Sequence, residues 1–186
     1  MPILRDVAIA LLFAWISIDA IVVFRRKSGR AENRDRSSLR LLMIAGPLVW
    51  MVGIGLAFTS IGAFVFPAGQ VVGLLVMAIG IVLRSVAIAQ LGRFHTPNVA
   101  VLADHQVKAT GLYRHVRHPS YLGALIGFAG FGLALGNWLS LLLIVLVTPA
   151  IYLHRIREEE MALTEGLGDA YREYCRHTKR LIPWIY

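Results

Sequence analysis

The chain has 186 residues, of which 57% are hydrophobic and only 16% are charged, and its mean hydropathy is +0.65. A soluble domain is usually about half apolar and about a quarter charged, so this composition excludes an ordinary water-soluble globular domain. The net charge of +8 would suit nucleic acid, but the basic residues lie between long apolar runs, as they do in membrane proteins. We therefore expect no nucleic-acid partner.

Five apolar stretches predict membrane helices. In chain order they cover residues 7–24, 41–61, 71–91, 121–135 and 139–153. The first three come close to the roughly 20 residues that a helix needs to cross about 30 Å of hydrocarbon. The last two are shorter and are joined by a turn, so we expect a short helical hairpin there. The predicted fold is an all-α integral membrane protein with about five transmembrane helices and a cytoplasmic C-terminal helical segment.

The charge distribution predicts how these helices are oriented. Residues 1–6 are neutral overall, whereas Arg25, Arg26 and Lys27 follow the first stretch. This order is the reverse of a secretory signal peptide, so we expect a retained helix with its N-terminus outside. Residues 25–40 include seven basic and two acidic side chains, and residues 92–121 include four basic and one acidic. Cytoplasmic loops are enriched in Lys and Arg, so both segments are expected in the cytoplasm. Five crossings then place the tail from His154 on the same side.

The chain shows no internal repeat and no low-complexity tract, so residues 1–186 are interpreted as a single membrane-embedded domain. Residues 1–66 form generic N-terminal helices, and residues 92–186 are expected to form the functional part of the chain. Asp19 and Arg84 are charged side chains within the apolar stretches. Each is expected to reach water from near a helix end.

The fourth apolar stretch is rich in glycine. Two pairs of glycines, Gly123/Gly127 and Gly132/Gly136, are spaced four residues apart. Such spacing lets helix backbones approach closely in lipid. The simplest interpretation is helix packing.

Two polar segments next to the membrane stretches carry the candidate chemistry. Residues 98–121 end in Tyr-Arg-His-Val-Arg-His-Pro-Ser-Tyr, which places imidazoles, guanidiniums and phenols at the membrane boundary. Beyond the fifth stretch, Arg155 and Glu159 are four residues apart and share one helical face. A short helix is expected at residues 169–176.

Each polar group also has a structural interpretation. Arg114 and Arg117 could hold lipid phosphates at the inner leaflet. Glu158 and Glu160 are expected to form only a solvated helix face. No phosphate-binding loop or dinucleotide glycine signature is present, so the residues alone indicate a small membrane protein with a basic, aromatic, histidine-rich cytoplasmic site.

A metal site at His115 and His118 is not expected. The two histidines are three residues apart, but no cysteine or carboxylate of suitable spacing joins them, and the residues between them include a basic one. Cys175 is the single cysteine, so no internal disulfide is possible.

Two motifs carry a resemblance to a known family. The run Gly-Leu-Tyr-Arg-His-Val-Arg-His-Pro-Ser-Tyr-Leu-Gly at residues 111–123 resembles the signature of the isoprenylcysteine carboxyl methyltransferase family. A later pattern is similar to the same family's C-terminal motif: Glu158, Glu159, Glu160, Leu163, Gly168, Tyr171, Tyr174, Leu181, Ile182 and Pro183. The resemblance covers about the last half of the chain. Related membrane phospholipid methyltransferases share only the shorter Arg-His-Pro-x-Tyr part.

The resemblance implies S-adenosylmethionine as the cofactor, with S-adenosylhomocysteine as the product. The cofactor-binding residues that it implies are Asn98, His105, Gln106, Val107, Lys108, Tyr113, His118, Pro119, Ser120, Tyr121 and Glu159. It also implies that Arg155 holds the carboxylate of the acceptor, so Arg155 and Glu159 are the expected catalytic residues. Lys108 stands where eukaryotic members have an apolar residue, which favours a contact through its backbone.

The implied function is methylation of the carboxylate of a lipophilic, isoprenylcysteine-like acceptor that enters from the bilayer among the membrane lipids. An enzymatic alternative is N-methylation of a phospholipid amine, but an amine must lose a proton and would favour a carboxylate base over Arg155. An alternative of another class is a non-catalytic membrane protein that binds anionic lipid or a partner. Net basicity and short loops favour a prokaryotic inner membrane with the site facing the cytoplasm.

Overall fold

The computed structural model describes residues 2–25, 32–33, 38–64, 66–95, 100–101 and 106–182, and most of them are helical. The α-helices are α1 (Pro2–Arg25), α2 (Ser38–Ala57), α3 (Pro67–Leu91), α4 (Pro119–Ala134), α5 (Trp138–Leu167) and α6 (Asp169–His177). Two short 3-10 helices, η1 (Gly92–Phe94) and η2 (Gly111–Arg114), lie between α3 and α4. The strands β1 (Glu32–Asn33) and β2 (Ala100–Val101) pair antiparallel.

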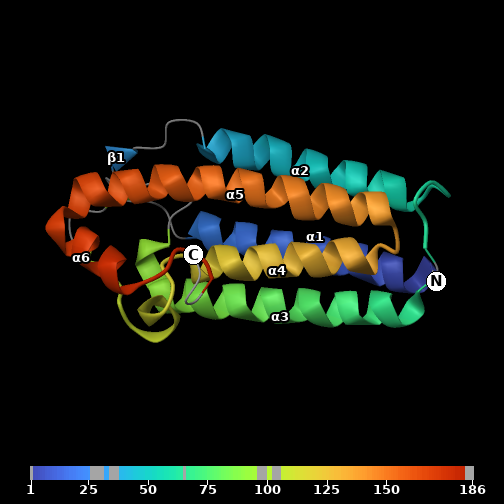
Figure 1. Cartoon of the computed structure of the whole chain (residues 1–186), viewed down its shortest axis with the longest axis horizontal. Helices are drawn as coiled ribbons and strands as arrows, with labels where there is room; N and C mark the ends of the chain where they lie inside the picture. The colour runs from blue at the N-terminus through green and yellow to red at the C-terminus, as the bar shows by residue number, and fades with distance from the viewer. Residues whose placement is uncertain are drawn as a thin grey trace.

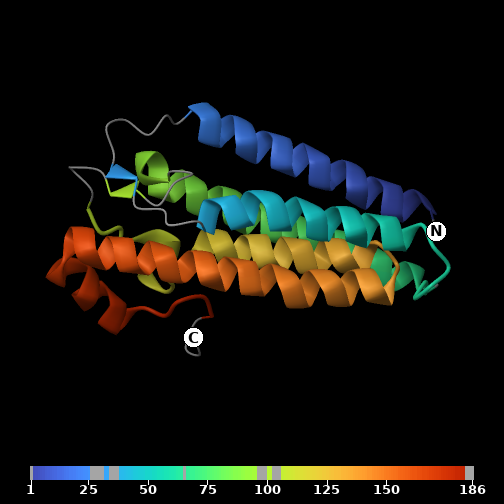
Figure 2. The same ribbon diagram turned by 90° about the horizontal axis from the view of Figure 1, so that it is seen from above.

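Helices α1 to α5 run side by side along one axis, and the connections that carry polar residues gather at one end of the bundle (Figures 1 and 2). At that end α6 folds back beside the end of α5, and η2 lies next to α3 and α4 (Figure 1). The core is filled by aromatic and aliphatic side chains: Leu12, Trp15, Met77, Phe128, Phe131, Ile144 and Tyr152. The arrangement places the polar segments together at one end.

The surface of the bundle is that of a membrane protein. Among the described residues, three helices are long and apolar enough to cross a membrane, namely Ser38–Ala57, Pro67–Phe94 and Trp138–Leu167. Large aliphatic side chains such as Leu75, Ile79 and Leu146 are exposed on their outer faces. In a bilayer, such side chains contact hydrocarbon and not water, so their exposure is favourable. The helices suit the same surroundings because every backbone polar group is satisfied inside the helix. Each of the five predicted apolar stretches forms a helix, although α2 ends at Ala57, four residues before the predicted end of its stretch. The number of helices that cross the bilayer stays a prediction.

The predicted hairpin of two short helices is wrong for its second helix. Helix α4 has only 16 residues, but α5 has 30 and continues without a break from the apolar stretch into the polar segment. Its start is fixed by Asn137, whose side chain accepts a hydrogen bond from the amide of Ser140 at 3.0 Å. Pro149 lies inside the helix, and α5 ends at Gly168, whose φ of 56° is left-handed. One continuous helix therefore links the membrane to the polar end.

Helices α3 and α4 pack unusually closely because glycines face each other across the interface. A Cβ atom built on Gly73, Gly80, Gly123 or Gly130 would overlap backbone atoms of the opposite helix. The predicted role of Gly123 and Gly127 in close packing is confirmed. The pair Gly132/Gly136 is different: a Cβ on Gly132 would lie 3.2 Å from Leu141 of α5, and Gly136 forms the turn with a φ of 69°.

A Gly80→Ala variant is expected to be less stable than the wild type by about 1–3 kcal/mol, because its methyl group would force the α3 and α4 backbones apart. The thermal unfolding midpoint in detergent measures this loss. Gly55→Ala in α2 is the matched control, since a Cβ there meets nothing within 4 Å. Equal midpoints for the two variants would contradict the role of Gly80 in packing.

The charged side chains of Asp19 and Arg84 pair inside the bundle. Arg84 Nε donates to Asp19 Oδ2 at 2.5 Å and its Nη1 donates to the backbone oxygen of Ser120 at 3.3 Å. The side chain of Asp19 is only 23% exposed, and that of Arg84 only 13%. The expectation that each separately reaches water is therefore wrong. Pairing removes the cost of an isolated buried charge and connects α1, α3 and α4.

Candidate active site

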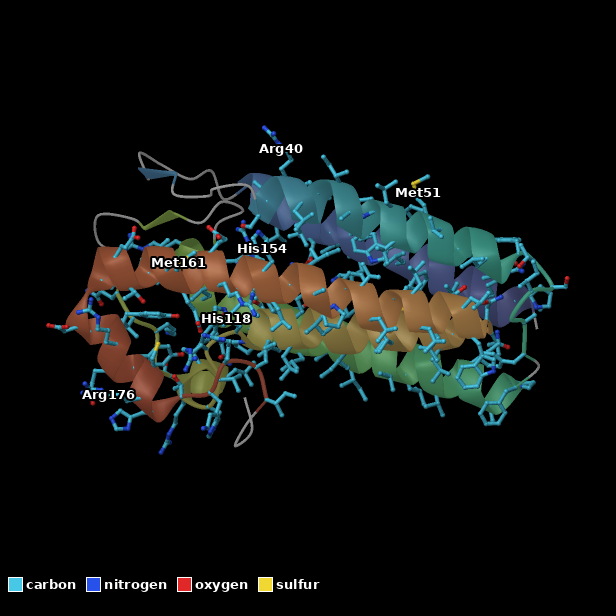
Figure 3. All side chains as sticks on the ribbon, turned by 45° about the horizontal axis from the view of Figure 1, so that its top comes forward. Arg40, Met51, His118, His154, Met161 and Arg176 are labelled. Atoms are coloured by element: carbon cyan, nitrogen blue, oxygen red, sulfur yellow. The ribbon has the colours of Figure 1, made fainter. Side chains whose placement is uncertain are left out.

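The candidate site lies at the polar end of the bundle, where three parts of the chain meet. These parts are residues 106–118, the polar half of α5, and α6 with residues 178–181. Figure 3 shows His118 and Met161 near this end, while Met51 lies toward the other end. Pro119 starts α4 directly after His118, since its fixed φ suits a first helical turn. The imidazole is thereby held at the end of a membrane helix.

Backbone pairing attaches the C-terminal segment 178–181 to the loop before α4. The amide of Arg117 donates to the oxygen of Lys179 at 2.8 Å, and the amide of His118 donates to the oxygen of Arg180 at 3.2 Å. In return, the amide of Lys179 donates to the oxygen of His115 at 3.3 Å. The two sequence motifs are therefore parts of one structural unit.

Glu160 lies among three basic side chains, and we call Arg117, His118, Glu160 and Arg180 the Glu160 cluster. The carboxylate of Glu160 is 2.8 Å from Arg117 Nε and 2.6 Å from Arg180 Nη2, and His118 Nε2 is 3.3 Å away. The side chain of Glu160 is only 12% exposed. The expectation that Glu160 belongs to a solvated face is therefore wrong. Arg117 also donates to the backbone oxygens of Cys175 and Thr178, so the cluster connects α5, α6 and the loop before α4.

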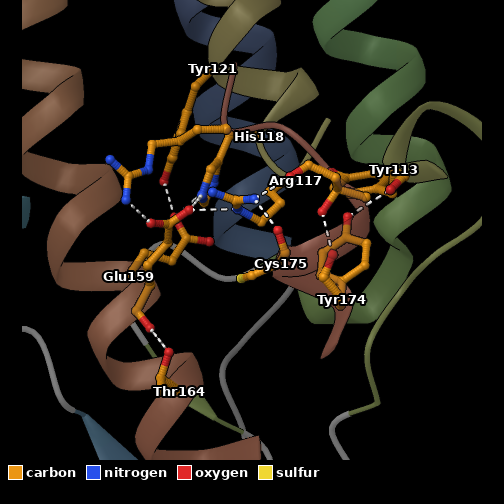
Figure 4. Close-up of polar contacts among 11 residues, drawn as sticks. Tyr113, Arg117, His118, Tyr121, Glu159, Thr164, Tyr174 and Cys175 are labelled. Carbon is orange, nitrogen blue, oxygen red and sulfur yellow. Dashed lines mark hydrogen bonds and ion pairs between the residues drawn. The ribbon is translucent and has the colours of Figure 1, made fainter. Parts of the chain in front are cut away.

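Tyr121 connects Arg155 with Glu159. Its hydroxyl donates to Glu159 Oε2 at 2.7 Å (Figure 4). The same hydroxyl accepts a hydrogen bond from Arg155 Nε at 3.4 Å. Arg155 is 3% exposed, whereas the side chain of Glu159 is 28% exposed. His118 Nδ1 lies 3.9 Å from the same Glu159 oxygen. One phenol hydroxyl thus contacts both a buried guanidinium and a partly exposed carboxylate.

A pocket of about 470 Å³, including its open mouth, lies beside Glu159. The lining residues are Leu91, Phe94, Gln106, Val107, Lys108, Tyr113, Arg117, His118, Glu159, Leu163, Leu167, Tyr171 and Tyr174. Apolar and aromatic side chains therefore surround a few polar groups and one carboxylate.

The structure brings together six of the cofactor-binding residues that the family resemblance implies. Gln106, Val107, Lys108, Tyr113, His118 and Glu159 all line the pocket. Pro119, Ser120, Tyr121 and Arg155 do not line it. Pro119 and Ser120 are buried at the start of α4. Tyr121 forms a hydrogen bond with Glu159, and Arg155 forms one with Tyr121. Asn98 and His105 lie outside the described residues.

Sequence reasoning missed most of the apolar wall of the pocket. The residues it did not assign to the site are Leu91, Phe94, Arg117, Leu163, Leu167, Tyr171 and Tyr174. A signal for two of them was present, because Glu159, Leu163 and Leu167 are spaced four apart and so share one face of α5. The tyrosines of α6 could not be placed, because the direction in which α6 folds back depends on the turn at Gly168.

The phenols beside the pocket remain neutral at physiological pH. Burial raises the pKa of Tyr113, Tyr171 and Tyr174 well above the usual value of a phenol. Tyr174 donates its hydroxyl hydrogen to the backbone oxygen of Tyr113 at 2.6 Å, and Tyr113 donates to the oxygen of Ala87 at 3.3 Å. These hydrogen bonds connect α6, η2 and α3, and they keep two rings in place as pocket walls.

No group of three or more His, Cys, Asp or Glu side chains that could hold a metal ion occurs among the described residues. His118 is instead directed at the carboxylates of Glu159 and Glu160. The side chains of the pocket suit an organic ligand that carries positive charge and a flat ring. The carboxylate favours the cation, and aromatic side chains favour both the cation and the ring.

Comparison with known proteins identifies relatives of the chain. The chain is 37% identical over 124 residues to protein-S-isoprenylcysteine O-methyltransferase of Schizosaccharomyces pombe, which covers 66% of this chain and 52% of that protein. It is 28% identical over 184 residues to a probable protein-S-isoprenylcysteine O-methyltransferase of Oryza sativa subsp. indica, covering 92% of this chain and 96% of that protein. The chain thus spans about half the length of the yeast relative and nearly all of the rice relative.

A solved structure and a family model agree with these relatives. The structure of the eukaryotic intramembrane Ras methyltransferase, an isoprenylcysteine carboxyl methyltransferase, matches with a TM-score of 0.63 and 28% identity, over 78% of this chain and 53% of that chain. The model of the isoprenylcysteine carboxyl methyltransferase family matches residues 71–165, which is just over half of the chain and includes most of α3, all of α4 and most of α5. The chain therefore belongs to the isoprenylcysteine carboxyl methyltransferase family.

Proposed function

We propose that this protein is an S-adenosylmethionine-dependent methyltransferase that methylates the carboxylate of a lipophilic, isoprenylcysteine-like acceptor. The observation that carries the proposal is the arrangement of Glu159, Tyr121 and Arg155. A pocket carboxylate and a buried guanidinium bond to the same phenol hydroxyl, at 2.7 Å and 3.4 Å. A site for a cationic methyl donor and a site for an anionic acceptor would therefore lie next to each other.

The pocket residues fit S-adenosylmethionine by their chemistry. The Glu159 carboxylate would balance the positive sulfonium, and the rings of Phe94, Tyr171 and Tyr174 offer apolar surface for the adenine. Residues 106–108 also line the pocket, and they would contact the cofactor there. Bound there, the cofactor would supply a methyl group that is already activated for transfer. The protein then needs only to align the acceptor.

Arg155 suits a carboxylate acceptor. A carboxylate is ionised at neutral pH, so no base is required, and a guanidinium holds it through two charge-assisted hydrogen bonds. Arg155 lies one helical turn before Glu159 along α5, on the side of the apolar stretch. A lipid tail attached to the acceptor would then extend among the membrane helices. Alignment of this kind supplies up to roughly 7–11 kcal/mol of a reaction barrier in favourable cases.

Charge supports a cytoplasmic location for the site. The polar end includes Arg93, Arg114, Lys179 and Arg180, and basic residues mark the cytoplasmic side of membrane proteins. The short loops and the net charge of +8 favour a prokaryotic inner membrane. We therefore propose that the cofactor enters from the cytoplasm and the acceptor from the bilayer.

The proposal predicts which acceptor receives a labelled methyl group from S-adenosylmethionine. The purified protein is expected to label a farnesylcysteine analogue and not phosphatidylethanolamine. The reason is that Arg155, the residue proposed to hold the acceptor, is a cation and not a base. An Arg155→Ala variant is expected to lose acceptor methylation while it still binds the cofactor by calorimetric titration. Label on the lipid amine alone would support the phospholipid alternative, and absence of saturable cofactor binding would support a non-catalytic lipid-binding protein.

A further inference from the structure

Arg155 receives a second polar contact from a helix far away in sequence. Ser38, the first residue of α2, accepts a hydrogen bond from Arg155 Nη1 at 2.9 Å, although 117 residues separate the two. The serine is 1% exposed. It lies outside residues 71–165, to which the family model matches. A buried serine in the N-terminal part of the chain thus contacts the residue proposed to hold the acceptor.

The two hydroxyl contacts fix the plane of the guanidinium. Tyr121 of α4 accepts from Nε at 3.4 Å, and Ser38 of α2 accepts from Nη1 at 2.9 Å. A guanidinium is rigid and planar, so partners at two of its nitrogens restrict its rotation about the side-chain axis. A paired hydrogen bond to a carboxylate requires that plane to be aligned. Loss of either hydroxyl would leave the charge in place but loosen its orientation.

We propose that Ser38 is a positioning residue, which orients Arg155 for the carboxylate of the acceptor. The inference rests on the function proposed above, and it extends the acceptor site from α4 and α5 to α2. Ser38 would act through Arg155 and not by touching the cofactor. Its removal should therefore weaken use of the acceptor and leave cofactor binding intact.

Ser140 provides a matched control for a purely structural role. Like Ser38, it is a buried serine that connects α2 with α5, because its hydroxyl donates to the backbone oxygen of Gly53 at 2.7 Å. It is 0% exposed and lies at the start of α5, fifteen residues before Arg155. Both serines therefore contribute a hydrogen bond between the same helices, but only Ser38 contacts Arg155.

The test compares the variants Ser38→Ala, Ser38→Thr and Ser140→Ala in methyl transfer to a farnesylcysteine analogue. Ser38→Ala is expected to raise the acceptor KM about tenfold, the effect of losing one hydrogen bond to a charged group, with the cofactor KM within about twofold of wild type. Ser38→Thr keeps the hydroxyl and should restore the acceptor KM. Ser140→Ala should lower the thermal midpoint without raising the acceptor KM.

Two results would overturn the inference. One is an unchanged acceptor KM for Ser38→Ala; the other is an equal rise of that KM for Ser140→Ala. Either result alongside an inactive Arg155→Ala would leave the proposed function standing and remove only the role of Ser38. Full activity of Arg155→Ala, or no carboxyl methylation by the wild type, would instead remove the proposed acceptor site, and the role of Ser38 with it.

Discussion

The Glu159→Gln variant is expected to bind S-adenosylmethionine about ten- to a hundredfold more weakly than the wild type, as calorimetric titration would measure. The substitution is well matched in shape, because the glutamine oxygen can still accept the hydrogen bond that Tyr121 donates at 2.7 Å. What it removes is the negative charge in the pocket. Interactions with a charged partner contribute about 1.5–3 kcal/mol, which corresponds to the expected change in affinity.

Glu158→Gln is the control for this experiment. It removes the same charge from the adjacent residue of α5, which does not line the pocket. Its affinity for the cofactor should match the wild type. If both variants bind equally well, Glu159 does not balance the sulfonium, and the assignment of the pocket to this cofactor loses its main support.

The helices and their order could be predicted because hydrophobicity alone determines them in a membrane protein. All five apolar stretches became helices, since a segment in lipid must satisfy its own backbone hydrogen bonds. The length of α5 could not be predicted in the same way. Its polar half continues the helix beyond the apolar stretch, and only the left-handed turn at Gly168 ends it.

The site could be predicted only where residues lie close together in sequence. Arg155 and Glu159 share a helical face at a spacing of four, and the family resemblance added the residues before α4. The contact between Ser38 and Arg155 has no local signal, because it depends on how α2 packs against α5. Arg84 and Asp19 are a similar case: each looked like an isolated charge until the fold paired them.

Glu160 shows why a charge run cannot be interpreted from sequence alone. Three consecutive glutamates on a helix point in different directions, since successive residues are about 100° apart around its axis. Glu159 faces the pocket, whereas Glu160 faces Arg117 and Arg180. The segment 178–181 brings Arg180 into this position by pairing with the loop before α4. The partner that decides the role of Glu160 thus comes from the end of the chain.

The Glu160→Gln variant is expected to lose about 3–5 kcal/mol of stability at the polar end of the bundle, and with it most cofactor binding. Removal of one member of a buried ion pair leaves the opposite charges uncompensated. Here Arg117 and Arg180 would face each other without the carboxylate that lies 2.8 Å and 2.6 Å from them. The loop that carries His118 and the segment 178–181 would then separate, and the pocket wall would open.

Glu173→Gln is the control, because Glu173 also pairs with basic side chains, Arg176 and His177, but on the surface. Its side chain is 56% exposed, so water and salt screen both pairs and their loss should change stability little. Thermal unfolding and cofactor titration of the two variants compare the loss of a buried carboxylate with the loss of an exposed one. If Glu160→Gln proves as stable as Glu173→Gln and binds the cofactor normally, the Glu160 cluster does not hold the pocket together.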